Sequence, residues 1–374
     1  MSHPVPIPPP VDCIVVGAGL SGLCTARGLA RAGVDFAVLE ARGRVGGRIL
    51  SRAARSNPQA RYDLGPAWVW PSFQPLATAL LAELGIPLFA QATAGAGLYE
   101  DDGQPAPLRI DGQSPHGESR RIAGGASTLV EALATELPPK TLHLEHTVTH
   151  IEAHPKGVAL DVRTPEGPRT WQARHVVLAL PPRLAVTEIA FDPPLAGDIR
   201  TRLAAIPTWM AAHAKLIALY EQPFWRNHGL SGEVFSRRGP LTEIYDASPA
   251  DGGPYALFGF YGLPAAARRA LGRDTLIQRG IDQIARLFGT QAGDPIECML
   301  QDWSTSLRTA TRMDEIPPSG HPQYGFNDIG RSQWDGRLLF AGTESAARNG
   351  GYLEGAVEAA METLELIAKP DRIR

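Results

Sequence analysis

Four residues near the N-terminus could hold a dinucleotide. Gly17, Gly19 and Gly22 stand in the order G-x-G-x-x-G, and Glu40 follows 23 residues after Gly17. Gly17 permits a tight turn, Gly19 lets the backbone approach a pyrophosphate, and Gly22 lets a helix pack closely on a strand. The carboxylate of Glu40 can hydrogen-bond a ribose hydroxyl. These residues therefore predict a phosphate site at a helix N-terminus, where free N–H groups face the ligand.

The elements around these residues decide the interpretation, because three glycines at this spacing arise easily by chance in a chain with 39 glycines. Residues 11–16 form an apolar run that is typical of a buried parallel strand. Residues 20–32 have helical spacing, and Gly33 ends the helix. A second apolar strand at 36–39 leads directly to the acid. The sequence therefore predicts a βαβ unit that binds a dinucleotide.

A basic, glycine-containing turn follows the ribose acid. Arg42, Gly46, Gly47 and Arg48 lie within eight residues of Glu40. A glycine pair flanked by arginines suits a second approach of the backbone to a bulky, anionic cofactor. A basic surface turn is the alternative that the composition leaves open.

Lys215 is the second candidate for chemistry. It lies within an apolar strand at 212–220, where a lysine is costly unless it meets water or a polar partner. His213 stands two residues earlier and therefore on the same strand face. A lysine that extends to water at a strand end, and a structural histidine, are the alternative interpretations.

Several segments, in chain order, resemble motifs of the flavin amine oxidase family, which includes monoamine and polyamine oxidases. Residues 40–48 resemble its FAD motif, and residues 337–356 resemble its C-terminal strand, Gly-Thr-Glu turn and helix. The other matching segments are 63–65, 122–130, 212–226, 241–245 and 302–304, with Pro66 in place of a second glycine. The resemblance extends from residue 11 to about residue 365 and implies bound FAD.

The resemblance also implies roles for individual residues. Lys215 matches the lysine that holds a water near flavin N5, and Tyr352 matches one of two aromatic rings that face the flavin, so both are candidate catalytic residues. The expected substrate pocket contains Trp68, His213, Tyr245 and Met313. The expected cofactor-binding residues are Gly17, Gly19, Gly22, Glu40, Arg42, Gly46, Gly47, Arg48, Gly65, Val148, Trp303, Gly342, Glu344, Gly351 and Leu353.

Met313 occupies the approximate position of the second aromatic ring of the family. No aromatic residue occurs between Trp303 and Tyr324, so a small shift of register cannot restore the ring. A methionine is polarisable but has no ring face to orient an amine. We therefore expect weak activity on benzylamine-like substrates and a preference for bulkier amines.

The motif order predicts an α/β fold in which a Rossmann-like FAD-binding domain is intertwined with a substrate domain. The expected FAD domain comprises residues 10–75, 120–205 and 305–374. The expected substrate domain comprises residues 76–119 and 206–304, built on a mostly antiparallel sheet plus helices. The segment between Asp63 and Gly124 is shorter than in monoamine oxidases. The pocket is then either open or completed by a second subunit in a homodimer.

By the same resemblance, the predicted reaction is oxidation of the C–N bond of an amine to an imine, with oxygen as acceptor and hydrogen peroxide as product. FAD should be bound non-covalently, because residues 305–324 contain no cysteine. A flavin-dependent desaturase and an amino-acid oxidase are alternatives within the superfamily, although no arginine stands out as a carboxylate ligand. A flavoprotein without catalytic activity is the alternative of another class.

Composition excludes several other functions. The net charge is −3, so the chain lacks the basic character of nucleic-acid-binding proteins. The three cysteines form no metal-binding spacing, and their small number favours a reducing, cytoplasmic location. No apolar run approaches the roughly 20 residues that a membrane span needs. We also expect no signal peptide, because residues 1–10 lack a charged start and a long apolar core.

Overall fold

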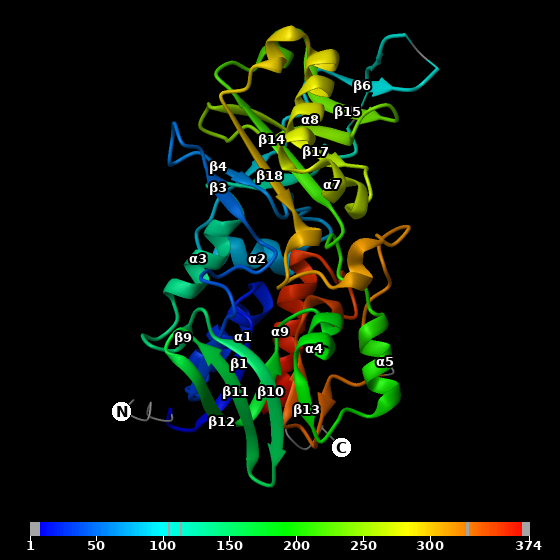
Figure 1. Ribbon diagram of the computed structural model, residues 1–374. Helices are drawn as coiled ribbons and strands as arrows, with labels where there is room; N and C mark the ends of the chain where they lie inside the picture. Colours follow the sequence, from blue (N-terminus) through cyan, green and yellow to red (C-terminus); the bar gives the residue numbers. More distant parts are fainter. Residues whose placement is uncertain (1–7, 104, 113, 327–328, 369–374) are drawn as a thin grey trace.

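The computed structural model describes residues 8–368, apart from residues 104, 113, 327 and 328. Two large β-sheets organise the chain, one in the lower and one in the upper part of Figure 1. The order along the first sheet is β13-β10-β11-β12-β1-β2-β9, with β20 beside β12 and β19 beside β20. Its strands are β1 (Val11–Val16), β2 (Phe36–Leu39), β9 (Leu142–His143), β10 (Thr147–His154), β11 (Gly157–Thr164), β12 (Gly167–Leu178), β13 (Ala190–Asp192), β19 (Ser332–Gln333) and β20 (Leu338–Phe340).

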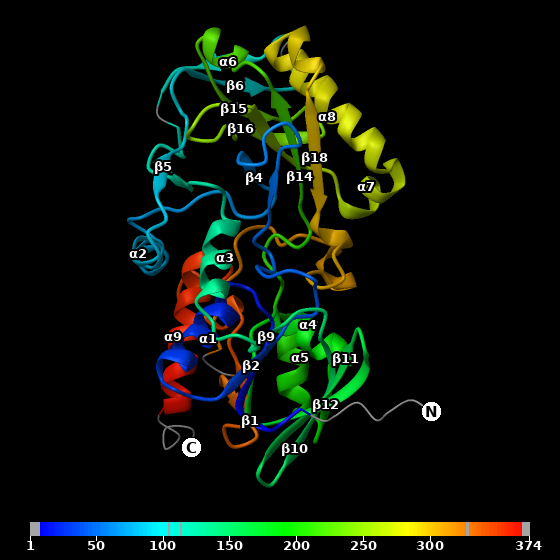
Figure 2. The same ribbon diagram turned by 90° about the vertical axis from the view of Figure 1, so that its left-hand side faces the viewer.

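Strand β1 lies at the centre of this sheet, parallel to both neighbours. Val16 pairs with Leu178 of β12 and with Leu39 of β2. Helices α1 (Leu20–Arg31), α3 (Ser127–Thr135) and α9 (Leu353–Ala368) lie together on one side of the sheet (Figure 2). Their apolar residues join those of β1 and β2 in one buried core. The apolar runs at residues 13–16 of β1 and 36–39 of β2 are explained by their burial on both faces of the sheet.

The second sheet has the order β18-β14-β17-β16-β15-β6-β7 and is antiparallel except where β15 pairs with β6. All seven residues of β14 are buried, because α8 packs on one face and residues 54–68 cover the other. The strands are β6 (Ala96–Glu100), β7 (Leu108–Ile110), β14 (Ala214–Tyr220), β15 (Leu230–Ser236), β16 (Leu241–Asp246), β17 (Tyr255–Tyr261) and β18 (Glu297–Asp302).

Two short strand pairs and the remaining helices connect these sheets. The pairs are β3 (Ser51–Ala53) with β4 (Arg61–Asp63), and β5 (Leu88–Ala90) with β8 (Arg120–Ile122). The other α-helices in the described part are α2 (Pro75–Glu83), α4 (Pro182–Glu188), α5 (Gly197–Ala205), α6 (Phe224–Asn227), α7 (Ala265–Leu271) and α8 (Arg273–Phe288), and the short 3-10 helices are η1 (Thr290–Gly293), η2 (Trp303–Thr305), η3 (Arg312–Glu315) and η4 (Thr343–Ser345). Within the described ranges, no helix combines the length and apolar character that crossing a membrane requires.

The N-terminal βαβ unit and the antiparallel sheet are present as predicted. Residues 90–120, which the sequence predicts as loop, instead contribute β6 and β7 to the second sheet. These strands are short, and their residues are spaced among glycines and prolines, which obscures the alternation. Helix α2 falls within the range expected for the substrate domain, yet its Ala77 and Leu81 pack in the core around β1 and α9.

Candidate active site

A cavity of about 600 Å³ extends from the glycine turn after β1 to strand β14 of the second sheet. Most of the residues expected at the site line this cavity. They are Gly17, Gly19, Glu40, Arg42, Gly46, Gly47, Arg48, Gly65, Val148, Trp303, Gly342, Gly351 and Leu353 of the expected cofactor set, together with Lys215, Tyr352, Trp68 and His213. Four expected residues, Gly22, Glu344, Tyr245 and Met313, do not line it.

The glycine turn between β1 and α1 is tightly packed at Gly22 and faces open space at Gly19. Gly17 has a φ of +103°, and a Cβ at Gly22 would lie 1.9 Å from the Gly17 carbonyl oxygen. Gly22 therefore acts in the approach of α1 to β1 rather than at the cavity surface. At Gly19, by contrast, a Cβ would meet no protein atom within 4 Å, so the space above this turn is free for a ligand. Glu40 lies beside it and accepts a hydrogen bond from the Ala18 N–H at 2.8 Å.

Arg48 connects this turn to the C-terminal motif. Its Nη2 lies 2.7 Å from Oε1 of Glu344, whose side chain is fully buried. Arg48 Nη1 is buried and has no hydrogen-bond partner among the described residues, although the residue lines the cavity. A buried cationic donor without a partner is expected to be satisfied by a ligand. The open space over Gly19 and this free donor both fit a dinucleotide such as FAD.

Lys215 of β14 also lines the cavity. Its Nζ donates hydrogen bonds to the backbone oxygens of Asp63 at 3.0 Å and Gly65 at 2.7 Å. The side chain is 2% exposed, and the rings of Phe258 and Phe260 lie 4.5 and 5.1 Å from Nζ. Burial lowers the pKa of Lys215 to about 7, against a smaller opposing effect of the Asp63 charge. This lysine therefore changes its charge near neutral pH.

Tyr352 forms one aromatic wall of the cavity, and Trp209 forms another that the sequence analysis missed. Trp209 packs beside Gly351, the residue before Tyr352, where an added Cβ would lie 3.0 Å from the Trp209 Cβ. The ring of His321 lies 4.7 Å from both aromatic rings. The family resemblance places the second ring after Trp303, near Met313, whereas Trp209 lies in the turn before β14. Its one signal in the sequence is an aromatic residue six positions before Lys215.

Met313 is not part of the cavity, which corrects the expectation of a methionine wall. Its side chain is 58% exposed. The neighbouring Asp314 is buried and binds Arg183 Nη1 at 2.5 Å and the Thr208 N–H at 3.1 Å. Because Asp314 is directed inward, Met313 is directed outward. The same carboxylate holds the turn that presents Trp209.

Tyr245 lies in a second layer behind the cavity wall. Its ring lies 4.9 Å from Trp68 and 4.7 Å from His116, and its hydroxyl donates to Glu243 at 2.9 Å. Trp68, His116 and Glu243 themselves line the cavity. Burial lowers the pKa of His116 to about 4, so this ring is neutral at physiological pH. Glu243 thus provides a carboxylate beside uncharged aromatic groups.

His213 lines the cavity, and its Nδ1 is buried without a hydrogen-bond partner. Burial lowers the pKa of this histidine, with a smaller contribution from Arg268. No group of His, Cys, Asp and Glu in the described residues could hold a metal ion. The described cysteines Cys13, Cys24 and Cys298 are unpaired and do not line the cavity.

Comparison with known proteins identifies the family. Residues 106–366 match the family model of flavin containing amine oxidoreductases, and residues 15–84 match an NAD(P)-binding Rossmann-like domain. The chain is 26% identical to the flavin-containing monoamine oxidase AofH of Mycobacterium tuberculosis over 96% of each chain. It is 30% identical to amine oxidase B of Sus scrofa over 67% of this chain and 47% of that protein.

Solved structures share the fold. Putrescine oxidase bound to putrescine has a TM-score of 0.80, 22% identity, and coverage of 96% of this chain and 99% of its own. Cyclohexylamine oxidase from Brevibacterium oxydans has a TM-score of 0.81 at 22% identity, with coverage of 97% and 100%. The α/β fold class is therefore confirmed. With the family match and the dinucleotide site together, this chain belongs to the flavin-containing amine oxidoreductase family and is an FAD-dependent enzyme.

Proposed function

We propose that this enzyme oxidises the C–N bond of an amine in the part of the cavity bounded by Lys215, Tyr352 and Trp209. The observation that carries the proposal is the convergence of these side chains on one cavity that begins at the dinucleotide turn. FAD, when bound, supplies the hydride acceptor. The residues of the second sheet then orient the amine and exclude water from it.

The lining residues divide into two groups that match this assignment. Gly19, Glu40 and Arg48 surround the glycine turn and are suited to the phosphates and ribose of FAD. Tyr352 and Trp209 provide ring faces against which an uncharged or cationic amine can pack. We propose the first group as the cofactor site and the second as the substrate site. The lobes around the two sheets are accordingly proposed as the FAD and substrate domains.

Lys215 is proposed to hold a water molecule and a positive charge beside the reacting part of the flavin. Its two hydrogen bonds go to backbone oxygens, which leaves the third Nζ proton for a ligand or water. Two aromatic rings and full burial keep this group in a site of low polarity, where its charge acts strongly. The lysine is thus placed to stabilise negative charge that develops during reduction.

The charges at the cavity favour an amine over an amino acid. Glu243 lies at the substrate end, where it would attract a cation and repel a carboxylate. The arginines among the described lining residues all lie with the cofactor segments: Arg42 binds Ser306 and Thr309, Arg48 contacts Glu344, and Arg308 binds Thr147. The same carboxylate disfavours a desaturase of apolar chains, since a carboxylate buried against hydrocarbon is costly even with one hydrogen bond from Tyr245.

Oxygen as electron acceptor, a homodimer and a cytoplasmic location complete the proposal. The support for oxygen is the family resemblance, and the support for the location is the small number of unpaired cysteines. The support for a homodimer is the short segment between Asp63 and Gly124, because a cavity that this segment leaves open can be closed by a second subunit.

The test is a panel of benzylamine, cyclohexylamine, putrescine and a bulky secondary amine, mixed without oxygen with the FAD-loaded enzyme. Bleaching of the flavin by an amine, followed by peroxide formation in air, is expected. Reduction by dithionite but by no amine would contradict the proposal and favour a flavoprotein without amine oxidase activity. Bleaching by amines without peroxide in air would retain the substrate assignment and reject oxygen.

A further inference from the structure

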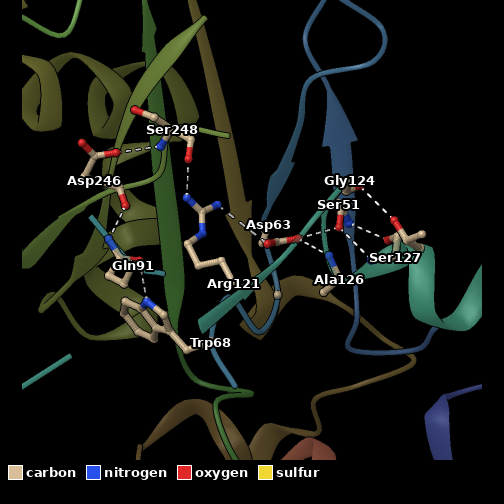
Figure 3. Close-up of polar contacts among 12 residues, drawn as sticks. Ser51, Asp63, Trp68, Gln91, Arg121, Gly124, Ala126, Ser127, Asp246 and Ser248 are labelled. Carbon is tan, nitrogen blue, oxygen red and sulfur yellow. Dashed lines mark hydrogen bonds and ion pairs between the residues drawn. The ribbon is translucent and has the colours of Figure 1, made fainter. Parts of the chain in front are cut away.

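Behind Lys215 lies a second layer of buried charge. Asp63, at the end of β4, and Arg121, in β8, are each 3% exposed, and their side chains point toward each other in Figure 3. Lys215 touches this layer through the backbone oxygen of Asp63, not through its carboxylate. Three ionisable side chains from three strands are therefore buried together, although none of them belongs to the dinucleotide site.

The carboxylate of Asp63 is oriented by two strong donors. Its Oδ1 accepts hydrogen bonds from Ser51 Oγ at 2.6 Å and from the Ala126 N–H at 2.8 Å. Its Oδ2 is buried without a hydrogen-bond partner and lies 3.9 Å from Arg121 Nη2. Two donors therefore hold one oxygen of the Asp63 carboxylate in place, and the other oxygen faces Arg121.

Arg121 is the fixed positive counterpart. Its Nη1 donates to the Ser248 backbone oxygen at 2.9 Å, while its Nε has no hydrogen-bond partner, and its guanidinium lies 5.4 Å from the Phe89 ring centroid. Figure 3 shows the guanidinium between Asp63 and Ser248. The ion pair is longer than a hydrogen-bonded one, so its two charges only partly satisfy each other. A guanidinium nevertheless stays charged in proteins.

The two fixed charges act on Lys215 in opposite directions. The negative charge of Asp63 raises the pKa of Lys215, and the positive charge of Arg121 lowers it, both against the larger lowering effect of burial. Without Asp63 the ammonium would have no counterion in this layer. Without Arg121 the Asp63 carboxylate would keep its donors Ser51 and Ala126 but lose the guanidinium beside its second oxygen.

Resting on the proposed function of Lys215, we propose that Arg121 and Asp63 are positioning residues that set the fraction of Lys215 carrying positive charge in the active site. The Asp63 carboxylate favours the charged form of Lys215, and the Arg121 guanidinium disfavours it. The enzyme thereby keeps a lysine that can exchange its proton near neutral pH, instead of a permanent cation.

Other charged or titratable groups around the cavity complete the environment of Lys215. Glu243 of β16 and His213, next to β14, line the same cavity, and Arg48 is paired with Glu344. Strands β17 and β18 place Phe260 and Gln301, both uncharged, opposite Lys215. Asp246 is bound by Arg226 and Trp225. These groups are common to all the variants below, so differences between variants report Asp63 and Arg121.

The test uses the FAD-loaded enzyme and sulfite, a probe that adds to oxidised flavin and leaves a negative charge on it. Sulfite affinity is measured from the loss of visible flavin absorption between pH 5.5 and 9.5, a range that brackets the lysine. In wild type, the sulfite affinity should change with pH as Lys215 loses its proton, and we call the centre of this change the midpoint. Lys215→Met should lack this change. Arg121→Met should move the midpoint to higher pH, and Asp63→Asn to lower pH, each by about one unit.

Three further variants separate charge from structure. Arg121→Lys keeps the positive charge and should stay close to the wild-type midpoint. The double variant Asp63→Asn/Arg121→Met removes both charges and should also return towards it. Arg52→Met is the matched control, because Arg52 lies on β3, the strand paired with that of Asp63, but its side chain is exposed, and it should not move the midpoint.

Shifts of both single variants in the same direction, or no shift in variants that keep their FAD, would overturn the inference and leave the pair a structural link. If Arg121→Met and Asp63→Asn fail to fold, the double variant and Arg121→Lys decide the question. A midpoint of sulfite binding far from the wild-type value in both of these variants would contradict the inference. Sulfite binding needs no amine. A negative amine panel would therefore reject the proposed function without affecting this result.

Discussion

Lys215 has an unusual position for a lysine, because both faces of its strand are covered and its ammonium group is bound only by backbone oxygens. We predict that Lys215→Met keeps FAD bound but lowers turnover by on the order of 100-fold, the typical effect of removing one electrostatic group from an active site. Neither Gly19 nor Arg48 is a hydrogen-bond partner of the Lys215 side chain, which donates to the backbone oxygens of Asp63 and Gly65 among the described residues. Steady-state kinetics and the FAD content of the purified variant check this. Wild-type turnover and oxygen reactivity would assign Lys215 a structural role only.

The same lysine should leave a signature in stability. Its pKa is about 7 in the folded protein against an ordinary value of 10.5, so between these values the unfolded chain binds a proton that the folded chain lacks. Stability contributed by this site therefore rises with pH through that window. We expect Lys215→Met to be stabilised relative to wild type most strongly at pH 6 and less at pH 9. Thermal unfolding of wild type and variant at both pH values measures the gain in stability. A larger gain at pH 9 than at pH 6 would contradict the lowered pKa of Lys215.

Trp209 and Met313 allow a paired prediction about the aromatic walls. Trp209 lines the cavity near Tyr352, whereas Met313 is exposed. Trp209→Ala should raise KM for amines by roughly fivefold, in line with the loss of one ring contact of about 1 kcal/mol. Met313→Ala should leave kcat and KM unchanged. Kinetics of both variants on one amine decide the matter, and a larger effect at Met313 would restore the wall expected from the sequence.

At the scale of elements, two glycines of the turn between β1 and α1 have different roles: Gly22 allows close packing, and Gly19 leaves space for a ligand. A Cβ at Gly22 would overlap the Gly17 carbonyl, whereas a Cβ at Gly19 would enter free space. We predict that Gly22→Ala lowers both thermal stability and FAD content. Gly19→Ala should lower FAD affinity with little change in the stability of the FAD-free chain. Dye-monitored melting and flavin content measured on the two variants test this, and equal melting temperatures without FAD would contradict the packing role of Gly22.

The sequence predicted elements well where the signal was local and strong. The βαβ unit is defined by apolar runs and glycines, and the segment around Lys215 by its apolar strand. It failed for β6 and β7, because short strands at the end of a sheet are fixed by partners distant in the chain. Trp209 could not be assigned for the same reason, because only the fold brings its turn to the cavity. The family resemblance identified the stretch 241–245, but Tyr245 was chosen as the wall and Glu243 lines the cavity instead. Met313 was misplaced because the register after Trp303 gave no sign that Asp314 faces inward.

At the scale of the whole molecule, the cavity joins the two lobes. Its lining comes from the strands and loops of the first sheet, from β14, β16 and β17 of the second, and from the start of α9. The alignment with the AofH protein extends over 464 positions, more than the 374 residues of this chain. That relative therefore carries segments that this chain lacks, which agrees with the short connection between Asp63 and Gly124.

A ligand that spans both lobes should couple them. FAD that contacts the glycine turn and reaches Lys215 binds only the folded, assembled chain, so it stabilises that chain in proportion to the logarithm of its free concentration. We predict a melting temperature that rises as FAD is added, and release of the yellow colour into the supernatant after acid precipitation, because no described cysteine lines the cavity. Riboflavin, which lacks the phosphates and the adenosine, is the control and should stabilise far less. Colour retained by the precipitate would show a covalent link, and a melting temperature independent of added FAD in a flavin-depleted sample would show that the cofactor does not join the lobes.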